Sequence, residues 1–313
     1  MSMTETIKLY DRDAYATEFE ADIISCEPNK ADDKRFDIIL NQTLFFPEEG
    51  GQSPDMGILG GFRVVDVQIK NGVITHTVDI SAGDCCIMGK EEAQTEKNAD
   101  GQITGMECVS EKAELAAGAH VHGKIDWQHR FYNMQQHSGE HIFSGIVHRR
   151  FGFENVGFHL SDSVVTMDFS GVISPEDIAE VEHEVNVAIS KNIPIEVTYP
   201  SRDELAQLEY RSKIEIEGQV RIVTVPGYDV CACCAPHVKR TGEIGMLKVM
   251  NYQNYKGGVR ISILCGFRAL EAFRQKCDII SELMGIFTTN QEAIVDNVTK
   301  LKAVNQSLKS ELG

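Results

Sequence analysis

The sequence predicts an α+β protein in three parts, which are a small N-terminal β-barrel, a central α+β region and a helical C-terminal tail. Three observations support this prediction. Short apolar runs between glycine pairs fill residues 15–80, helix-like and strand-like patterns mix in the centre, and the tail carries a heptad repeat. A chain of 313 residues is long enough for two domains with a substantial core. We place the parts at 1–120, 121–266 and 267–313.

Glycine turns between strand-length runs predict the barrel. Residues 62–69 mix apolar and polar side chains at strand spacing, and residues 73–78 follow after Asn71 and Gly72. Asn-Gly is a strong two-residue hairpin signal, because both turn positions need a positive φ. Several such strands indicate a small barrel. The segment from 81 to about 118 has little periodicity and an excess of acids, so we interpret it as an acidic insertion that forms a lid, an appendage or a disordered segment.

The central region combines helices and strands. The pattern predicts a helix over 130–149 and a strand over 164–169. Ser174 followed by Pro175 indicates a helix start, with serine as the N-cap and proline in the first turn. Strands are then expected at 195–199, 244–249 and 259–264.

The tail from residue 267 is predicted to be helical. Its apolar residues recur at alternating steps of four and three, with Asn305 at an a position of the heptad. The members of this seam are Ile294, Val298, Leu301, Asn305, Leu308 and Leu312. A lone asparagine at position a of a heptad fixes the register and favours pairing of two strands. Because the heptads are few, two alternatives remain, a homodimeric coiled coil and a long helix packed on its own domain.

Charge and cysteine usage limit the classes of function. A net charge of −17 argues against broad electrostatic binding to nucleic acid. Basic residues nevertheless gather between 237 and 268, which indicates either a local cationic face or chance clustering of solubilising charge. The sequence has no apolar run of membrane-spanning length and no secretory signal at its start. With nine cysteines that include two adjacent pairs, we predict reduced thiols and a cytoplasmic location.

Two half-motifs predict a zinc site. His137 and His141 are four residues apart, so they share one face of the predicted helix. Cys233 and His237 repeat this step. Three imidazoles and one thiolate suit Zn²⁺ in hardness and in ligand number. The alternative is that the cysteines are small core residues and the histidines are a chance pair.

The choice of sulfur ligand and the coordination stay open in the sequence. Cys231 and Cys234 are rival thiols for Cys233. Four protein ligands close a tetrahedral site, so the metal orients substrate and fold unless one ligand is loose. Glu140 does not have the spacing of a zinc-protease base, so we interpret it as solvent-exposed charge.

At this point the chain resembles the alanyl-tRNA editing proteins, the AlaX family of free-standing relatives of the alanyl-tRNA synthetase editing domain. The resemblance covers roughly residues 7–268. Its motifs are Thr43–Gln52 with Pro54, Asp55 and Gly57, Ile125–Trp127, Arg130, Met134–His141, Cys233–His237, Thr241–Gly245 and Gly258–Arg260.

The resemblance implies an N-terminal β-barrel, a zinc-binding editing domain and a helical tail that aids dimerisation and tRNA contact. It implies hydrolysis of mischarged tRNA(Ala), chiefly seryl-tRNA(Ala) and sometimes glycyl-tRNA(Ala). His137, His141, Cys233 and His237 match the zinc ligands of the family. One departure is that Cys234, Ala235 and Pro236 stand where the family often has Gly-Gly-Thr, which changes the shape of the pocket.

Residues beyond the metal ligands follow as hypotheses. Thr43 and Gln52 are candidates to read a serine hydroxyl, and turn and barrel structure is the alternative role for both. Gln136 is a candidate contact to the ester. Candidate tRNA phosphate contacts are Lys239, Arg240 and Arg260.

Two rival functions remain. One is a zinc-dependent hydrolase that acts on a small ester or amide and does not bind RNA. The other is a non-catalytic interaction module whose fold is stabilised by zinc.

Overall fold

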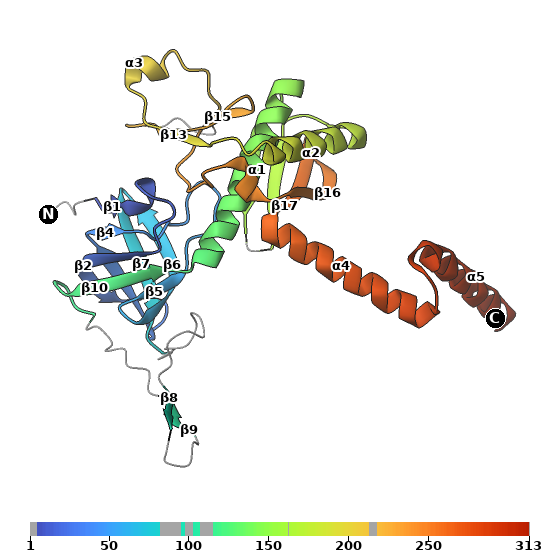
Figure 1. Ribbon diagram of the computed structural model, residues 1–313, viewed down its shortest axis with the longest axis horizontal. Coiled ribbons are helices and arrows are strands. Elements are labelled where there is room, and N and C mark those ends of the chain that lie inside the picture. The colour runs from blue at the N-terminus through green and yellow to red at the C-terminus, as the bar shows by residue number, and fades with distance from the viewer. Residues whose placement is uncertain are drawn as a thin grey trace.

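The computed structural model describes residues 5–81, 95–97, 103–106, 115–161, 163–212 and 218–312. It confirms the predicted α+β class, with several sheets and a C-terminal helix (Figure 1). Most of the acidic insertion expected at 81 to about 118 lies outside the described residues. Within it, the described residues are Ser81, the antiparallel pair β8 (Thr95–Lys97) and β9 (Ile103–Met106), and residues 115–118. None of the described helices has the length and apolar character that a membrane crossing needs.

Six strands of the N-terminal half close into a barrel, in the order β10-β2-β3-β7-β6-β5. Their bounds are β2 Glu18–Pro28, β3 Arg35–Leu40, β5 Gly57–Leu59, β6 Phe62–Lys70, β7 Val73–Asp79 and β10 His120–Ile125. The expected hairpin between β6 and β7 is confirmed, with φ of 52° at Asn71 and 77° at Gly72. Because β10 closes the barrel, the boundary expected at 120 falls inside this unit.

A short parallel pair and one 3-10 turn border the barrel. The pair is β1 (Ile7–Lys8) with β4 (Gln42–Thr43), and the turn is η1 (Leu9–Asp11). Alternating residues of the strands bury a core between the barrel walls, in which Ile38, Val64 and Ile74 have no exposed surface.

The central half contains two antiparallel sheets and three α-helices. One sheet has the order β11-β12-β17-β16, and the other has the order β13-β14-β15. The strand bounds are β11 Asn155–Leu160, β12 Val165–Phe169, β13 Glu196–Thr198, β14 Ile222–Val225, β15 Asp229–Ala232, β16 Leu247–Tyr255 and β17 Gly258–Cys265. The helices are α1 (Trp127–Phe151), α2 (Pro175–Ser190) and the one-turn α3 (Arg202–Leu205).

Local signals explain where these elements begin and end. The Asp126 side chain accepts from the His129 N–H at the start of α1, and Gly152 ends the helix in the left-handed region. The expected cap at Ser174 is confirmed, because its hydroxyl accepts from the Asp177 N–H. The strand expected from residue 244 is corrected. Residues 241–244 form the 3-10 turn η2, and Gly245 has a φ of 80° before β16 begins.

The tail is two helices rather than one. α4 (Gly266–Phe287) projects from the sheets, and α5 (Ile294–Leu312) lies at its far end (Figure 1). Thr288 has a φ of 48° and the 3-10 turn η3 (Gln291–Ala293) follows, so the chain changes direction there. α5 packs against α4, while its seam residues Val298, Leu301 and Leu308 are 44%, 58% and 52% exposed. The expected alternative of a long helix packed on its own domain is therefore wrong.

Candidate metal centre

The four predicted zinc ligands converge between α1 and the loop after β15. His137 and His141 lie on one face of α1, and their side chains are buried. The Cys233 Sγ lies 3.5 Å from the His137 Nε2 and 3.4 Å from the His237 Nε2. One ligand atom from each of the four residues, His141 included, lies within 4.8 Å of the others. Tetrahedral zinc separates sulfur and nitrogen ligands by about 3.6 Å, so this spacing fits the ion.

Each imidazole is oriented by a partner on its outer nitrogen. The His137 Nδ1 lies 2.8 Å from the Gln52 Oε1, and the His141 Nδ1 lies 2.9 Å from the Asp229 Oδ2. The His237 Nδ1 lies 3.0 Å from the Ser138 Oγ. Bonds of this kind fix the tautomer and ring orientation of metal-binding histidines. The Nε2 atoms therefore remain for an ion at the centre.

The electrostatics also suit a metal. Burial would raise the pKa of the Cys233 thiol, but the neighbouring histidines, chiefly His137, lower it well below its ordinary value. Burial lowers the pKa of His237 to about 3, so this ring is neutral at pH 7. Burial would lower the pKa of His141, but its hydrogen bonds to Asp229 and Cys233 raise it to about 9, so a bound zinc ion would displace a proton from this ring. The residues present fit a zinc ion.

The two rival thiols face other groups. Cys231 lies on β15 and groups with His141 and Asp229 within 4.8 Å, on the outer side of the His141 ring. Cys234 lies near Gly50, where an added Cβ would be 3.5 Å from its sulfur. Burial raises the pKa of both thiols. The geometry thus favours Cys233 as the sulfur ligand.

The glycine turn of the barrel brings Gln52 to the centre. The Gln52 N–H donates to the Glu49 carbonyl across Gly50 and Gly51, which have φ of 63° and 84°. A side chain at Gly51 would meet the Phe158 carbonyl at 2.5 Å, so the turn needs glycine to approach β11. The Gly51 carbonyl accepts from the Leu160 N–H at 2.7 Å, which joins the barrel to the central sheet.

Thr43 lies in the barrel core, and its hydroxyl is engaged there. The His76 Nδ1 lies 3.1 Å from the Ile38 carbonyl, so the neutral ring carries its proton on Nδ1. Burial lowers the pKa of His76 to about 4, which keeps the ring neutral at pH 7. Thr43 therefore donates to the His76 Nε2 and accepts from the Phe45 N–H. In this structure both bonds of the Thr43 hydroxyl are made within the barrel.

The Gln136 side chain connects α1 to the end of β17 through hydrogen bonds. Its Nε2 donates to the Cys265 carbonyl at 2.8 Å, and its Oε1 accepts from the Cys265 N–H at 2.7 Å. Both ends of the amide are thus committed to the backbone of one residue.

Glu140 is a correction, because the expected exposed charge is buried. Its side chain is 2% exposed, and its Oε1 accepts from Ser144 and from Asn155, each at 2.7 Å. The error arises because α1 buries polar residues on nearly every side over 133–147.

The three cationic residues predicted to contact tRNA phosphates differ in exposure and in their hydrogen bonds. Lys239 is 64% exposed at its side chain, and its Nζ lies 4.3 Å from the centre of the Tyr15 ring. Arg240 is also exposed and donates to the Asn192 carbonyl. Arg260 makes two bonds to Asp168, at 2.6 and 2.7 Å.

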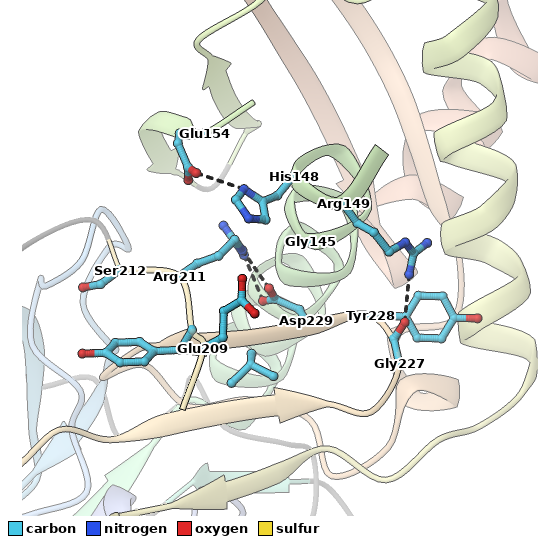
Figure 2. Close-up of a pocket in the computed structure, with 12 residues that line it drawn as sticks. Gly145, His148, Arg149, Glu154, Glu209, Arg211, Ser212, Gly227, Tyr228 and Asp229 are labelled. Atoms are coloured by element: carbon cyan, nitrogen blue, oxygen red, sulfur yellow. Dashed lines mark hydrogen bonds and ion pairs between the residues drawn. The ribbon is translucent and has the colours of Figure 1, made fainter. Parts of the chain in front are cut away.

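A cavity of about 600 Å³ lies beside the outer partner of His141 (Figure 2). Arg211 points into it and donates to both oxygens of Asp229, at 2.7 and 2.9 Å. Sequence reasoning missed Arg211, Asp229 and Ser138. Ser138 adjoins His137, and Asp229 and Cys231 alternate along β15, but Arg211 lies in a stretch without a periodic signal.

Comparisons with known proteins agree on one group. The family described as "Threonyl and Alanyl tRNA synthetase second additional domain" matches residues 220–262. The alanyl-tRNA editing protein AlaX-L of Pyrococcus horikoshii is 26% identical over 97% of this chain and 69% of its own length. The alanyl-tRNA editing protein Aarsd1 of Danio rerio is 27% identical over 96% of this chain and 69% of its own length. The alanine–tRNA ligase of Ignicoccus hospitalis is 26% identical over 97% of this chain and 31% of its own length.

Proposed function

We propose that this chain, a relative of the alanyl-tRNA editing proteins of the AlaX type as its motifs predict, hydrolyses the ester of mischarged tRNA(Ala). The substrates are chiefly seryl-tRNA(Ala) and also glycyl-tRNA(Ala). The observation that carries the proposal is the buried His137, His141, Cys233 and His237 group, with an oriented partner on every imidazole. The location we propose is the cytoplasm.

The ligands and their outer hydrogen-bond partners have different proposed roles in the reaction. A zinc ion held by the four ligands would polarise the ester carbonyl as a Lewis acid. The aminoacyl ester is activated, so a positioned water is enough to cleave it. The Gln52 side chain bonds the His137 ring and so connects this ligand to the glycine turn. Asp229 and Ser138 keep the other two rings in place.

Gln52 is the proposed reader of the serine hydroxyl. Its Nε2 is buried and has no hydrogen-bond partner within the described residues. A site built to bond a substrate hydroxyl rejects the analogue without it, because the buried polar group is then left unpaired. The Thr43 hydroxyl and the Gln136 amide already make hydrogen bonds within the protein. Of these three candidate residues, Gln52 is therefore the one with an unused N–H donor among the described residues.

Lys239 and Arg240 are the proposed phosphate contacts. Arg260 is held by two hydrogen bonds to Asp168, whereas Lys239 is 64% exposed and its Nζ lies 3.8 Å from the Oδ1 of its acidic neighbour Asp13. We expect Lys239→Ala/Arg240→Ala to weaken tRNA binding and to reduce the slope of log affinity against log salt by about 1.4 to 1.8. Binding titrations across salt concentrations measure this slope. Lys30→Ala/Lys34→Ala, on the β2–β3 turn, is the control with a smaller change. An unchanged slope in the first variant would remove these residues from the tRNA interface.

The exposed seam of α5 is the proposed homodimer contact. All of its heptad positions after Ile294 are exposed, and a lone asparagine at position a favours two strands. We expect Leu301→Glu to convert a dimer to a monomer in light scattering, whereas Ala303→Glu, off the seam, leaves the mass unchanged. A monomeric wild type at micromolar concentration would contradict the proposal.

The proposed function is tested by comparing substrates with the wild-type protein. Deacylation rates are measured on seryl-tRNA(Ala), alanyl-tRNA(Ala) and a small serine ester. Editing predicts fast loss of serine from tRNA, slow loss of alanine and little turnover of the small ester. Equal turnover of the small ester and the seryl-tRNA would favour a hydrolase without RNA.

A further inference from the structure

Unpartnered polar atoms gather around the glycine turn. The Glu49 Oε2, the Gln52 Nε2, the Ser53 Oγ and the Tyr10 OH are all buried, and none has a hydrogen-bond partner within the described residues. Leaving a buried polar atom without a partner costs free energy, so such atoms are rare in folded proteins. Two of these residues, Glu49 and Gln52, belong to the turn that reaches the metal centre, so their unpartnered atoms point to a ligand that pairs with them.

The turn geometry brings the two residues that carry these atoms close together. Glu49 and Gln52 are the first and fourth residues of the turn, and the Gln52 N–H donates to the Glu49 carbonyl at 3.1 Å. The ends of such a turn lie within about 7 Å of each other. Gln52 contacts His137, while Glu49 is hydrogen-bonded to the thiol of Cys234, which adjoins the ligand Cys233. Both side chains therefore border the metal centre.

The charges indicate what the ligand carries. Among the described residues the Glu49 Oε2 has no hydrogen-bond partner, while Arg130 bonds Asp55 and Arg221 bonds the Cys233 and Ala235 carbonyls. A buried carboxylate oxygen without a partner attracts a cationic donor. Zn²⁺ with a single thiolate keeps a net positive charge, so a cationic substrate group beside it needs a counter-charge.

We propose that the Glu49 carboxylate binds the α-ammonium group of the aminoacyl ester, while Gln52 donates to an oxygen of the same aminoacyl group. This inference rests on the proposed function and assigns Glu49 as a specificity-determining residue. An ammonium group offers three donors, of which Glu49 takes one. The loop would then select substrates with a free amino group.

The test compares seryl-tRNA(Ala) with N-acetylseryl-tRNA(Ala), in which the positive charge is removed. Values of kcat/KM are measured for wild type, Glu49→Gln and the matched control Glu48→Gln. Glu48 is an exposed neighbour whose carboxylate accepts from Gln68 at 2.8 Å. Zinc content and Tm are recorded for each protein, so that a folding defect is recognised.

Loss of one charge-assisted hydrogen bond lowers kcat/KM by roughly 10- to 100-fold. We expect Glu49→Gln to lose this factor on seryl-tRNA(Ala), and its preference for the free amine to fall at least about tenfold. Glu48→Gln should behave as wild type. Unchanged preference in Glu49→Gln, with normal zinc content, would overturn the role of Glu49 and leave editing intact. If wild type hydrolyses neither ester, the proposed function itself fails.

Discussion

Cys233→Ala is expected to lose zinc. The Cys233 sulfur lies within 3.5 Å of two imidazole nitrogens, and the neighbouring histidines, chiefly His137, lower its pKa well below the ordinary value. Removing even an outer partner of a metal ligand costs about 10- to 100-fold in affinity, so loss of a ligand should exceed about 100-fold. Zinc competition against a chelator measures the affinity, and the sulfur-to-metal absorption of the cobalt-loaded protein should disappear.

Two neighbouring cysteines provide matched controls for this prediction. Cys231→Ala and Cys234→Ala remove thiols of the same segment that face other groups. Both variants should keep the wild-type zinc affinity within a few-fold and retain the absorption band of the cobalt form. Retention of the band in Cys233→Ala together with its loss in Cys231→Ala would show that the sulfur ligand has been assigned wrongly.

Arg130→Met is expected to be the most destabilising single substitution. The Arg130 guanidinium donates to both oxygens of Asp55 and to the Leu44 and Ala14 carbonyls, and neither charged side chain is exposed. It thus ties α1 to the barrel. Removing one partner leaves a buried charge uncompensated, which costs about 3–5 kcal/mol. Denaturant unfolding followed by circular dichroism measures the loss.

A double variant separates the buried charge from the lost packing. Arg130→Met/Asp55→Asn removes both charges, so it should be more stable than Arg130→Met alone. The control Arg274→Met breaks an exposed ion pair with Glu271 and should change the free energy of unfolding by less than about 1 kcal/mol. If Arg130→Met unfolds like this control, the ion pair is not what joins α1 to the barrel.

The sequence predicts the ligand set of the centre because helical geometry is local. A step of four residues places His137 and His141 on one face wherever α1 packs. The hairpin at Asn71 and the cap at Ser174 follow for the same reason, since each depends on the φ or side chain of the residue itself. Such features need no knowledge of the rest of the fold.

The outer partners of the ligands could not be predicted in this way. Gln52 reaches His137 from 85 positions away, and Asp229 reaches His141 from 88 positions away. These contacts exist only because the glycine turn docks on β11 and β15 lies along α1. Burial of Glu140 was missed for a related reason. The polar face of α1 is covered by the barrel and the sheets rather than by water.

The most direct measurement is single-turnover deacylation of seryl-tRNA(Ala) and alanyl-tRNA(Ala) by zinc-loaded wild type and by His137→Ala/His141→Ala. We expect rapid loss of serine, slow loss of alanine and no activity in the variant, because both helical ligands of the centre are gone. Equal and slow loss of both amino acids, with no effect of the substitutions, would contradict editing at this centre and would indicate a purely structural zinc site.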